Sequence, residues 1–271
     1  MRDELGQIIT WYGAATDMHE EWVALAAAHA ARAEAEAALQ TRDHFLSIAS
    51  HELRTPLTSL IGYAEMLSRA TTQGRGNIPK MTEHITRQAQ RLNSLVGQLL
   101  DVPRLQQGQF VIERRPVDVV AVIAQVVMEF RAALPADSQH VVDLSQPDEP
   151  IIIMGDAQRL EQVLQNLLTN AVKYSPAGGP VRVRVMSRVG EAVVEVEDHG
   201  IGIPADAHDR LFEPFYRAAN VGARTSGFGL GLHIVREIVQ RHGGRIAVQS
   251  TEGAGSIFCV VLPLDAVSDA R

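Results

Sequence analysis

The sequence predicts an α + α/β protein, in which a helical hairpin precedes a layered α/β domain. Two segments carry apolar residues at spacings of three and four, as amphipathic helices do, and a polar loop joins them over residues 71–77. After Gly108, short Val/Ile-rich runs alternate with helical stretches, which is typical of helices packed on a sheet. Because each hairpin helix has one apolar face, two copies of the hairpin would form a four-helix bundle.

The N-terminal segment predicts one strand followed by one helix. Residues 7–17 are rich in β-formers and end in a turn-like Thr-Asp pair. A lone strand is not stable, so we expect its partners upstream of this chain. Residues 18–40 are rich in Ala and Glu and contain no Gly or Pro, which favours a helix. Its apolar face is thin, so it is either a dimeric coiled coil or a solvent-exposed spacer.

The two hairpin helices have well-defined apolar stripes. The first stripe comprises Phe45, Ala49, Leu53, Leu57, Leu60, Ala64 and Leu67. The second comprises Met81, Ile85, Ala89, Leu92, Val96 and Leu99. Two prolines interrupt this pattern. We expect Pro56 to bend the first helix and Pro103 to kink the second or end it early, because proline lacks a backbone donor.

The remainder predicts one α/β domain over residues 109–264, after a helical domain over 43–108. Strands are expected over residues 181–185, 192–196, 245–249 and 257–261, and helices over 118–133, 156–172 and 230–241. The tail, residues 265–271, is small and polar. With the N-terminal segment over 1–17, which contains the expected strand, and the helix over 18–42, this division accounts for the whole chain.

Composition excludes several classes of function. The formal charge of −7 and the absence of a Lys/Arg run argue against a nucleic-acid groove or a membrane-binding basic patch. The longest apolar stretch, residues 119–128, is too short to span a bilayer. Cys259 is the only cysteine, so no internal disulfide forms. With no secretion signal, the chain is expected to be cytoplasmic, and a membrane-anchored parent protein remains open.

His51 is a candidate nucleophile on the first hairpin helix. At about 100° per residue it lies about 200° from the apolar stripe through Leu53, so it faces solvent, and Thr55 shares that side. A neutral imidazole can accept a phosphoryl group, and Glu52 can fix its tautomer or take its proton. From these residues alone, a merely solvated histidine stays open. A zinc site is excluded because Thr55 stands where a second histidine is needed.

Ser50-His-Glu-Leu-Arg-Thr-Pro-Leu57 resembles the H box of two-component sensor histidine kinases. The resemblance implies that His51 is autophosphorylated and that Glu52 is its general base. It also implies that Thr55 positions the water that dephosphorylates a response regulator.

Asn166-Leu-Leu-Thr-Asn170-Ala-Val-Lys173-Tyr174 resembles the N box of the same family. Asn166 and Asn170 are one helical turn apart, and amide oxygens there can ligate Mg²⁺ together with phosphate oxygens, with Asn170 as the metal ligand. Lys173 can neutralise phosphate charge. Standing alone, two asparagines near a helix end would indicate caps or solvated groups.

Three further segments follow in the order that the family requires. Asp198-His-Gly200-Ile-Gly202 resembles the G1 box, in which the carboxylate accepts a hydrogen bond from the adenine amino group and the glycines allow a tight turn. Leu211-Phe-Glu-Pro-Phe215-Tyr-Arg217 resembles the F box, with Arg217 as a phosphate contact and the phenylalanines as packing residues.

Gly227-Phe-Gly229-Leu-Gly231-Leu resembles the G2 box, where backbone N–H groups at a helix N-terminus can receive phosphates. Residues 218–226 are small and polar, as expected for a lid over ATP. Phe228 departs from the family, which usually has a small hydroxyl residue there, and this puts lid packing and ATP affinity in doubt.

The resemblance spans residues 45–262 and implies a homodimeric, ATP- and Mg²⁺-dependent histidine kinase with the ATP-binding α/β sandwich of gyrase-type ATPases. It implies transfer of the phosphoryl group from His51 to a response regulator. Residues 1–17 resemble the end of a PAS sensor domain, which implies an upstream sensor. Two alternatives stay open: a pseudokinase that only binds nucleotide, suggested by Phe228, and a gyrase- or chaperone-type ATPase, against which the H box speaks.

Overall fold

The computed structural model describes residues 4–7, 29, 32, 47, 49–50, 52–72, 77–106, 111–135, 137–221 and 227–264. It divides into two units, Met1–Ile48 and Ala49–Arg271. In the first unit, His29 and Arg32 are helical, in agreement with the helix expected over 18–42. The rest of that helix, and the strand expected over 7–17 apart from Gln7, lie outside the described residues.

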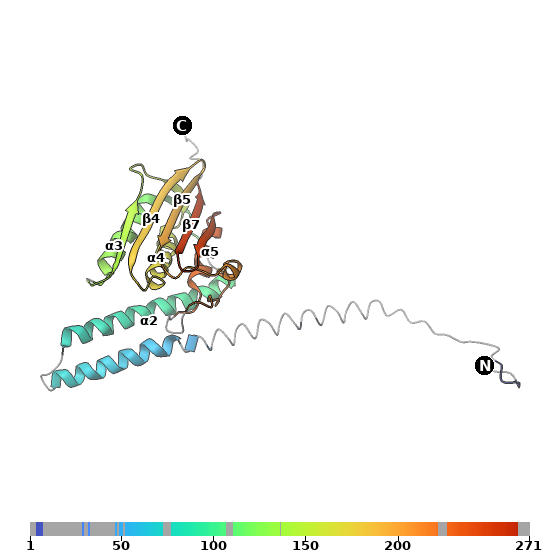
Figure 1. Cartoon of the computed structure of the whole chain (residues 1–271), viewed down its shortest axis with the longest axis horizontal. Coiled ribbons are helices and arrows are strands. Elements are labelled where there is room, and N and C mark those ends of the chain that lie inside the picture. Colours follow the sequence, from blue (N-terminus) through green and yellow to red (C-terminus); the bar gives the residue numbers. More distant parts are fainter. Residues whose placement is uncertain are drawn as a thin grey trace. The chain divides into compact units, whose positions relative to one another are not determined.

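The second unit begins with two helices that lie side by side, residues 52–72 and α2 (Ile78–Gln106) (Figure 1). The rings of Tyr63 and His84 stack between them with centroids 4.5 Å apart. The first helix continues two residues into the expected loop, where the Thr72 hydroxyl donates to the Ser68 carbonyl. Asn77 then caps α2, because its side-chain oxygen accepts the Lys80 N–H at 3.1 Å.

The expectation that Pro103 ends the second helix early is wrong, since α2 continues to Gln106. Proline has a backbone φ close to the helical value, so it does not oppose the helical conformation at its own position. Pro103 lies in the last turn, so the loss is limited to the one helical hydrogen bond that its own missing N–H would have made.

A five-stranded sheet forms the centre of the α/β region, with strand order β2-β4-β5-β7-β6. The strands are β2 (His140–Ser145), β4 (Gly179–Arg188), β5 (Glu191–Asp198), β6 (Arg245–Thr251) and β7 (Gly255–Pro263). β2 runs parallel to β4, and the other pairs are antiparallel. The four strands that the sequence predicted are confirmed as β4, β5, β6 and β7.

Three strands and a short helix were not predicted. β1 (Arg115–Asp118) and β3 (Ile152–Gly155) form a separate antiparallel pair, and η1 (Ala205–Arg210) is a 3₁₀ helix. β1 and β3 have four residues each, too few to show a clear alternation. β2 is an edge strand whose Val141 is 60 % exposed, so its apolar pattern is also weak.

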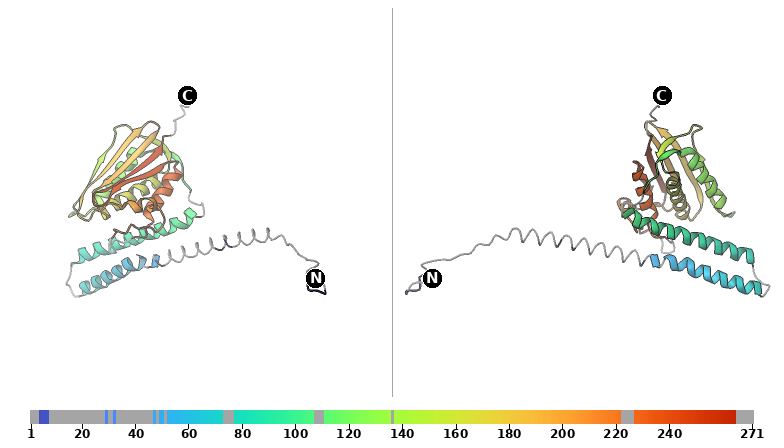
Figure 2. Two further views of the ribbon diagram at one scale, coloured as in Figure 1. Left: turned by 45° about the vertical axis from the view of Figure 1, so that its right-hand side comes forward. Right: turned by 180° about the vertical axis from the view of Figure 1, so that it is seen from behind.

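Three helices pack on one face of the sheet: α3 (Val119–Ala133), α4 (Ala157–Lys173) and α5 (Gly231–Arg241) (Figure 2). All three agree with the predicted helices to within one residue. Apolar side chains of these helices and of the sheet's inner face form the core, among them Leu167, Leu168, Ile234, Ile238, Val183 and Val196, all at most 1 % exposed. The fold class predicted from the sequence is therefore confirmed.

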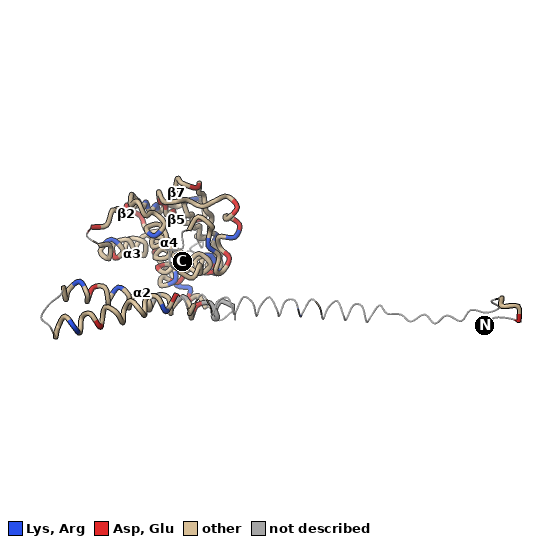
Figure 3. The backbone as a smooth tube through the Cα atoms, turned by 60° about the horizontal axis from the view of Figure 1, so that its bottom comes forward, with Lys and Arg blue, Asp and Glu red and all other residues tan. Residues whose placement is uncertain are grey.

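The sheet's other face carries paired charges. Arg184 donates to Glu195 at 3.0 Å and to Glu197 at 2.8 Å, and Arg182 donates to Glu197 at 2.9 Å. Over the described residues, basic and acidic positions are interspersed along the chain (Figure 3).

A buried polar cluster joins α2 to α4. The Asp101 carboxylate is 7 % exposed, accepts from the Gln162 amide at 2.8 Å and lies 3.5 Å from the Arg159 guanidinium. Arg159 also donates to the Gln162 side-chain oxygen at 2.8 Å, which closes the cluster. The hairpin is thus tied to the N-terminal half of α4, one turn before Asn166.

Within the described residues, none of the helices combines the length and the apolar character that crossing a bilayer requires.

Candidate functional site

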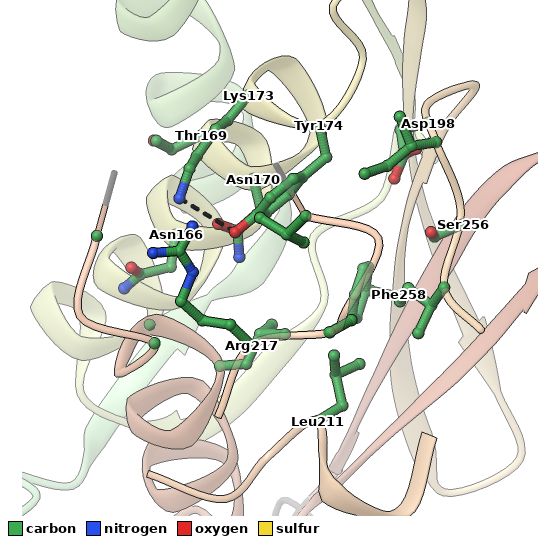
Figure 4. A pocket seen from close by; sticks show the side chains of 18 of the residues that line it. Asn166, Thr169, Asn170, Lys173, Tyr174, Asp198, Leu211, Arg217, Ser256 and Phe258 are labelled. Atoms are coloured by element: carbon green, nitrogen blue, oxygen red, sulfur yellow. Dashed lines mark hydrogen bonds between the residues drawn. The ribbon is translucent and has the colours of Figure 1, made fainter. Parts of the chain in front are cut away.

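A cavity of about 670 Å³ opens between α4, the N-terminus of α5 and the ends of β5 and β7 (Figure 4). Segments that are far apart in the sequence meet in its wall. Ten of the predicted site residues line it: Asn166, Asn170, Lys173, Tyr174, Asp198, Gly202, Arg217, Gly227, Gly229 and Gly231. Gly200 belongs to the adjoining turn and does not itself line the cavity.

The amide and ammonium groups of α4 lie on one side of the cavity because their spacings of three and four place them on one helix face. The Asn166 amide nitrogen donates to the Gln162 carbonyl at 2.9 Å. Its side-chain oxygen would lie 3.1 Å from a Cβ atom at Gly231, so it faces the start of α5. The Lys173 ammonium donates to the Tyr174 hydroxyl at 3.1 Å (Figure 4).

Asp198 lies at the end of β5 and is 7 % exposed. Burial raises the pKa of its carboxyl, while the N–H groups of Gly200 and Ser256 stabilise the charged form and oppose that rise in pKa. The Gly200 N–H donates to the Asp198 carboxylate at 2.9 Å and thereby orients it. A buried carboxylate at a cavity wall can accept a hydrogen bond from an amino group of a ligand.

The two glycines after Asp198 are required by close backbone approach. A Cβ atom at Gly200 would collide with the Tyr174 carbonyl oxygen, and one at Gly202 with the Thr251 carbonyl oxygen. Gly202 also has a φ of +63°, which other residues rarely adopt. The Asn220 amide donates to the Gly202 carbonyl at 3.0 Å and ties the segment after Arg217 to this turn.

The N-terminus of α5 presents backbone donors to the cavity. Its capping position, Leu230, has no side-chain hydrogen bond to the first turn, so the first N–H groups of the helix keep their donor capacity. Gly227 lies beside the Lys173 ammonium, which would be 3.2 Å from a Cβ atom there. A positive helix end next to a cation is suited to binding an anion.

The apolar wall of the cavity was not predicted from the sequence. Ile203, Leu211 and Phe258 line it, and Phe258 comes from β7, far along the chain from the motifs. Alternation of apolar residues in β7 predicts that Phe258 is buried but not what it faces. Phe228 also lines the cavity and is 1 % exposed, so this departure from the family motif is a packed wall residue.

Two of the three predicted catalytic residues, Glu52 and Thr55, lie on the first hairpin helix. His51 itself lies outside the described residues, as do residues 222–226 of the expected lid. Thr55 is exposed, as predicted. The Glu52 carboxylate accepts a hydrogen bond from the Gly227 N–H at 2.7 Å, which joins the hairpin to the start of the glycine-rich segment.

The side chains present restrict how a metal ion would bind. Among the described residues, no group of three or more His, Cys, Asp or Glu side chains is placed to hold one. The amide oxygens of Asn166 and Asn170 at the cavity wall fit Mg²⁺, which is commonly held by few protein ligands together with phosphate oxygens and water.

Comparisons with known protein families match two regions of the chain. Residues 41–108 match the family model of the His Kinase A (phospho-acceptor) domain. Residues 155–266 match that of the Histidine kinase-, DNA gyrase B-, and HSP90-like ATPase. The first match lies on the hairpin and the second on the region that contains the cavity.

Curated relatives align with most of this chain. It is 39 % identical over 246 residues to the probable sensor histidine kinase TcrY of Mycobacterium tuberculosis, covering 89 % of this chain and 49 % of TcrY. It is 32 % identical over 227 residues to the sensor histidine kinase WalK of Bacillus subtilis, covering 83 % of this chain and 37 % of WalK. The chain thus spans half or less of the length of these two relatives.

Solved structures share the fold. The histidine kinase AdeS of Acinetobacter baumannii superposes with a TM-score of 0.58 at 27 % identity, covering 79 % of this chain and 98 % of that one. Full-length ShkA in complex with AMPPNP superposes with a TM-score of 0.52 at 26 % identity, covering 82 % of this chain and 45 % of that one.

Proposed function

We propose, since this chain belongs to the sensor histidine kinases, that it transfers the γ-phosphoryl group of ATP to His51 and then to an aspartate of a response regulator. The observation that carries the proposal is the convergence of four motif segments on one cavity, in a unit that also contains the hairpin. The hairpin match to a phospho-acceptor domain favours this reading over a gyrase- or chaperone-type ATPase.

The adenine end of the proposed nucleotide site is at Asp198. Its buried carboxylate accepts a hydrogen bond from the adenine amino group. The apolar wall formed by Ile203, Leu211 and Phe258 packs against the base. Because the Gly200 N–H already holds one carboxylate oxygen, Asp198 is oriented before the nucleotide binds.

The phosphate end lies between α4 and α5. Lys173, Arg217 and the N–H groups at the start of α5 supply positive charge and donors to the phosphates. Asn170, together with Asn166, would hold Mg²⁺ through the amide oxygens, and the ion would offset the charge that develops on the phosphates during transfer. The complex of ShkA with AMPPNP is consistent with a triphosphate in such a site.

Phosphoryl transfer then takes place at His51. A ring nitrogen lone pair attacks the γ-phosphorus, the bond to the β,γ-bridging oxygen breaks, and ADP leaves with that oxygen. Glu52 takes the proton from the other ring nitrogen. The phosphoryl group passes next to a carboxylate of the response regulator, and Glu52 returns its proton to the ring, which restores neutral His51. Thr55, exposed on the same helix, positions the water that hydrolyses the aspartyl phosphate of the regulator.

We also propose that the hairpin dimerises and that regulation reaches it from an upstream sensor. Among the hairpin side chains that the structure describes, six large apolar ones are at least 40 % exposed in the single chain: Leu57, Ile61, Met66, Ile78, Val96 and Leu100. A second hairpin would bury them in a four-helix bundle. The junction over residues 105–110 is the proposed hinge, and a longer flexible linker there would uncouple the helix over 18–42 from activity.

The test is incubation of the full chain with γ-labelled ATP and Mg²⁺. Wild type is expected to take up acid-labile, alkali-stable label, and His51→Gln and Asn170→Asp to take up none. Asn93→Asp makes the same chemical change at an exposed position of α2 and should label normally. If wild type binds ATP but takes no label, the chain is a pseudokinase and the proposal fails.

A further inference from the structure

The contact between Glu52 and Gly227 has a role that the proposed reaction does not explain. The Glu52 carboxylate is bound to a donor of the glycine-rich segment at 2.7 Å, 175 residues away in the sequence. A general base needs its carboxylate at the imidazole, whereas here one carboxylate oxygen is committed to another partner. The same residue is therefore placed in two competing interactions.

The donor that Glu52 occupies has the properties of a phosphate-binding group. Gly227 lines the cavity and lies beside Lys173, whose ammonium would be 3.2 Å from a Cβ atom at Gly227. Its φ of +136° is a backbone conformation that residues other than glycine rarely adopt. A backbone N–H next to a cation, shortly before a helix N-terminus, binds carboxylate and phosphate oxygens by the same charge-assisted hydrogen bond.

This donor also lies at the end of the cavity that faces the hairpin. Besides Glu52 at Gly227, Leu95 of α2 lines the same cavity and is 6 % exposed. A phosphoryl group that is to reach the hairpin has to leave from this end. The phosphate nearest to Gly227 is therefore the terminal one of a nucleoside triphosphate.

We propose that the Glu52 carboxylate competes with the terminal phosphate of the nucleotide for the Gly227 N–H. Two anionic oxygens next to one another at a single donor repel, so the triphosphate displaces Glu52. The displaced carboxylate is then available to the adjacent residue His51, its partner in the proposed reaction. Binding of a triphosphate thus releases the base, whereas a diphosphate leaves it bound. This inference rests on the proposed function, since it needs a nucleotide in the cavity.

The test compares the affinities of AMPPNP and ADP, each with Mg²⁺, by titration calorimetry of the full chain. Glu52→Gln keeps the shape but leaves a weaker, neutral acceptor, so it should bind AMPPNP about threefold to tenfold more tightly than wild type. ADP affinity should stay within about twofold, because ADP has no terminal phosphate to compete. Glu65→Gln removes the same charge at an exposed position of the same helix and should change neither affinity.

Hydrogen exchange gives a second readout that requires no nucleotide. The Gly227 amide should exchange faster in Glu52→Ala than in wild type, and at the wild-type rate in Glu65→Ala. An unchanged exchange rate in Glu52→Ala would overturn the proposal, as would an equal gain of affinity for AMPPNP and ADP in Glu52→Gln. If wild type bound neither nucleotide, the proposed function would fail first, and this inference with it.

Discussion

At the scale of single residues, His242 is a buried histidine that the proposed mechanism does not use. It is 2 % exposed, and its Nδ1–H donates to the Ile238 carbonyl at 2.8 Å. Its Nε2 accepts the Asp156 N–H at 3.0 Å. Both ring nitrogens are satisfied only in the neutral tautomer, because a protonated ring has no acceptor. His242 thus joins the C-terminus of α5 to the N-terminus of α4 in a pH-dependent way.

This arrangement predicts a loss of stability in mild acid. Burial lowers the pKa of His242 from its usual value of 6.5, and Arg114 lowers it further, against the hydrogen bond to Ile238 and the attraction of Asp156, which raise it. As the pH falls through 6.5, the unfolded chain binds the proton first. The free energy of unfolding therefore falls by up to about 1.4 kcal/mol per pH unit until the folded-state pKa is reached.

Urea unfolding at pH 7.5 and 5.5 measures this effect. His242→Gln should reduce the difference between the two pH values. Part of the difference should remain, because burial also lowers the pKa of His233. An identical pH dependence in wild type and His242→Gln would contradict the assignment.

At the scale of elements, the helices of the α/β region differ in how they begin. Asp118 caps α3 by accepting the Val120 N–H at 3.0 Å, and Asp156 caps α4 by accepting the Arg159 N–H at 3.2 Å. α5 has no such side chain at Leu230. A capping carboxylate there would occupy the donors that the proposed phosphates need, which is a physical reason for its absence.

Removal of the α3 cap should destabilise the fold measurably. Asp118 also accepts the Ile151 N–H at 3.2 Å, so it joins α3 to the start of β3. We expect Asp118→Ala to lower the free energy of unfolding by about 1–2 kcal/mol, measured by urea denaturation. Asp143→Ala, at an exposed position of β2, should change it by less than about 0.5 kcal/mol. Equal effects of the two changes would show that the cap contributes little.

At the scale of the whole molecule, the hairpin of a single chain exposes large apolar side chains to water. Ile61 is 49 % exposed and Leu100 56 %. Single exposed apolar residues are ordinary on protein surfaces, but Leu57 and Ile61 are one helical turn apart, as are Val96 and Leu100, so each pair shares one helix face and together they indicate an interface. The proposed dimer would bury both pairs.

Light scattering after size exclusion tests the dimer. Ile61→Asp should shift the full chain from dimer to monomer, because two buried carboxylates would face each other across the bundle. Val141→Asp, at a 60 % exposed valine of β2, should leave the oligomeric state unchanged. Wild type that elutes as a monomer would refute the dimer, and Ile61→Asp that remains dimeric would place the interface elsewhere.

The fold class, the main helices and the longer strands were predictable from sequence patterns alone. Periodic apolar residues predict α3, α4 and α5 because burial of one helix face requires that spacing. The motif residues were also recognisable. Gly200 and Gly202 allow a tight turn of the backbone, and the side-chain amides of Asn166 and Asn170 lie one helical turn apart, so both features depend on local sequence spacing. Short elements such as β1 and β3 were missed because four residues hold too little pattern.

Which distant groups meet became visible only in the folded chain. The hydrogen bonds from Gln162 to Asp101 and from Gly227 to Glu52 each join residues more than fifty positions apart, and Phe258 reaches the cavity from β7. Sequence periodicity reports whether a side chain is buried, because that depends on its own element. Which partner it meets depends on how elements pack, and packing is a property of the assembled chain.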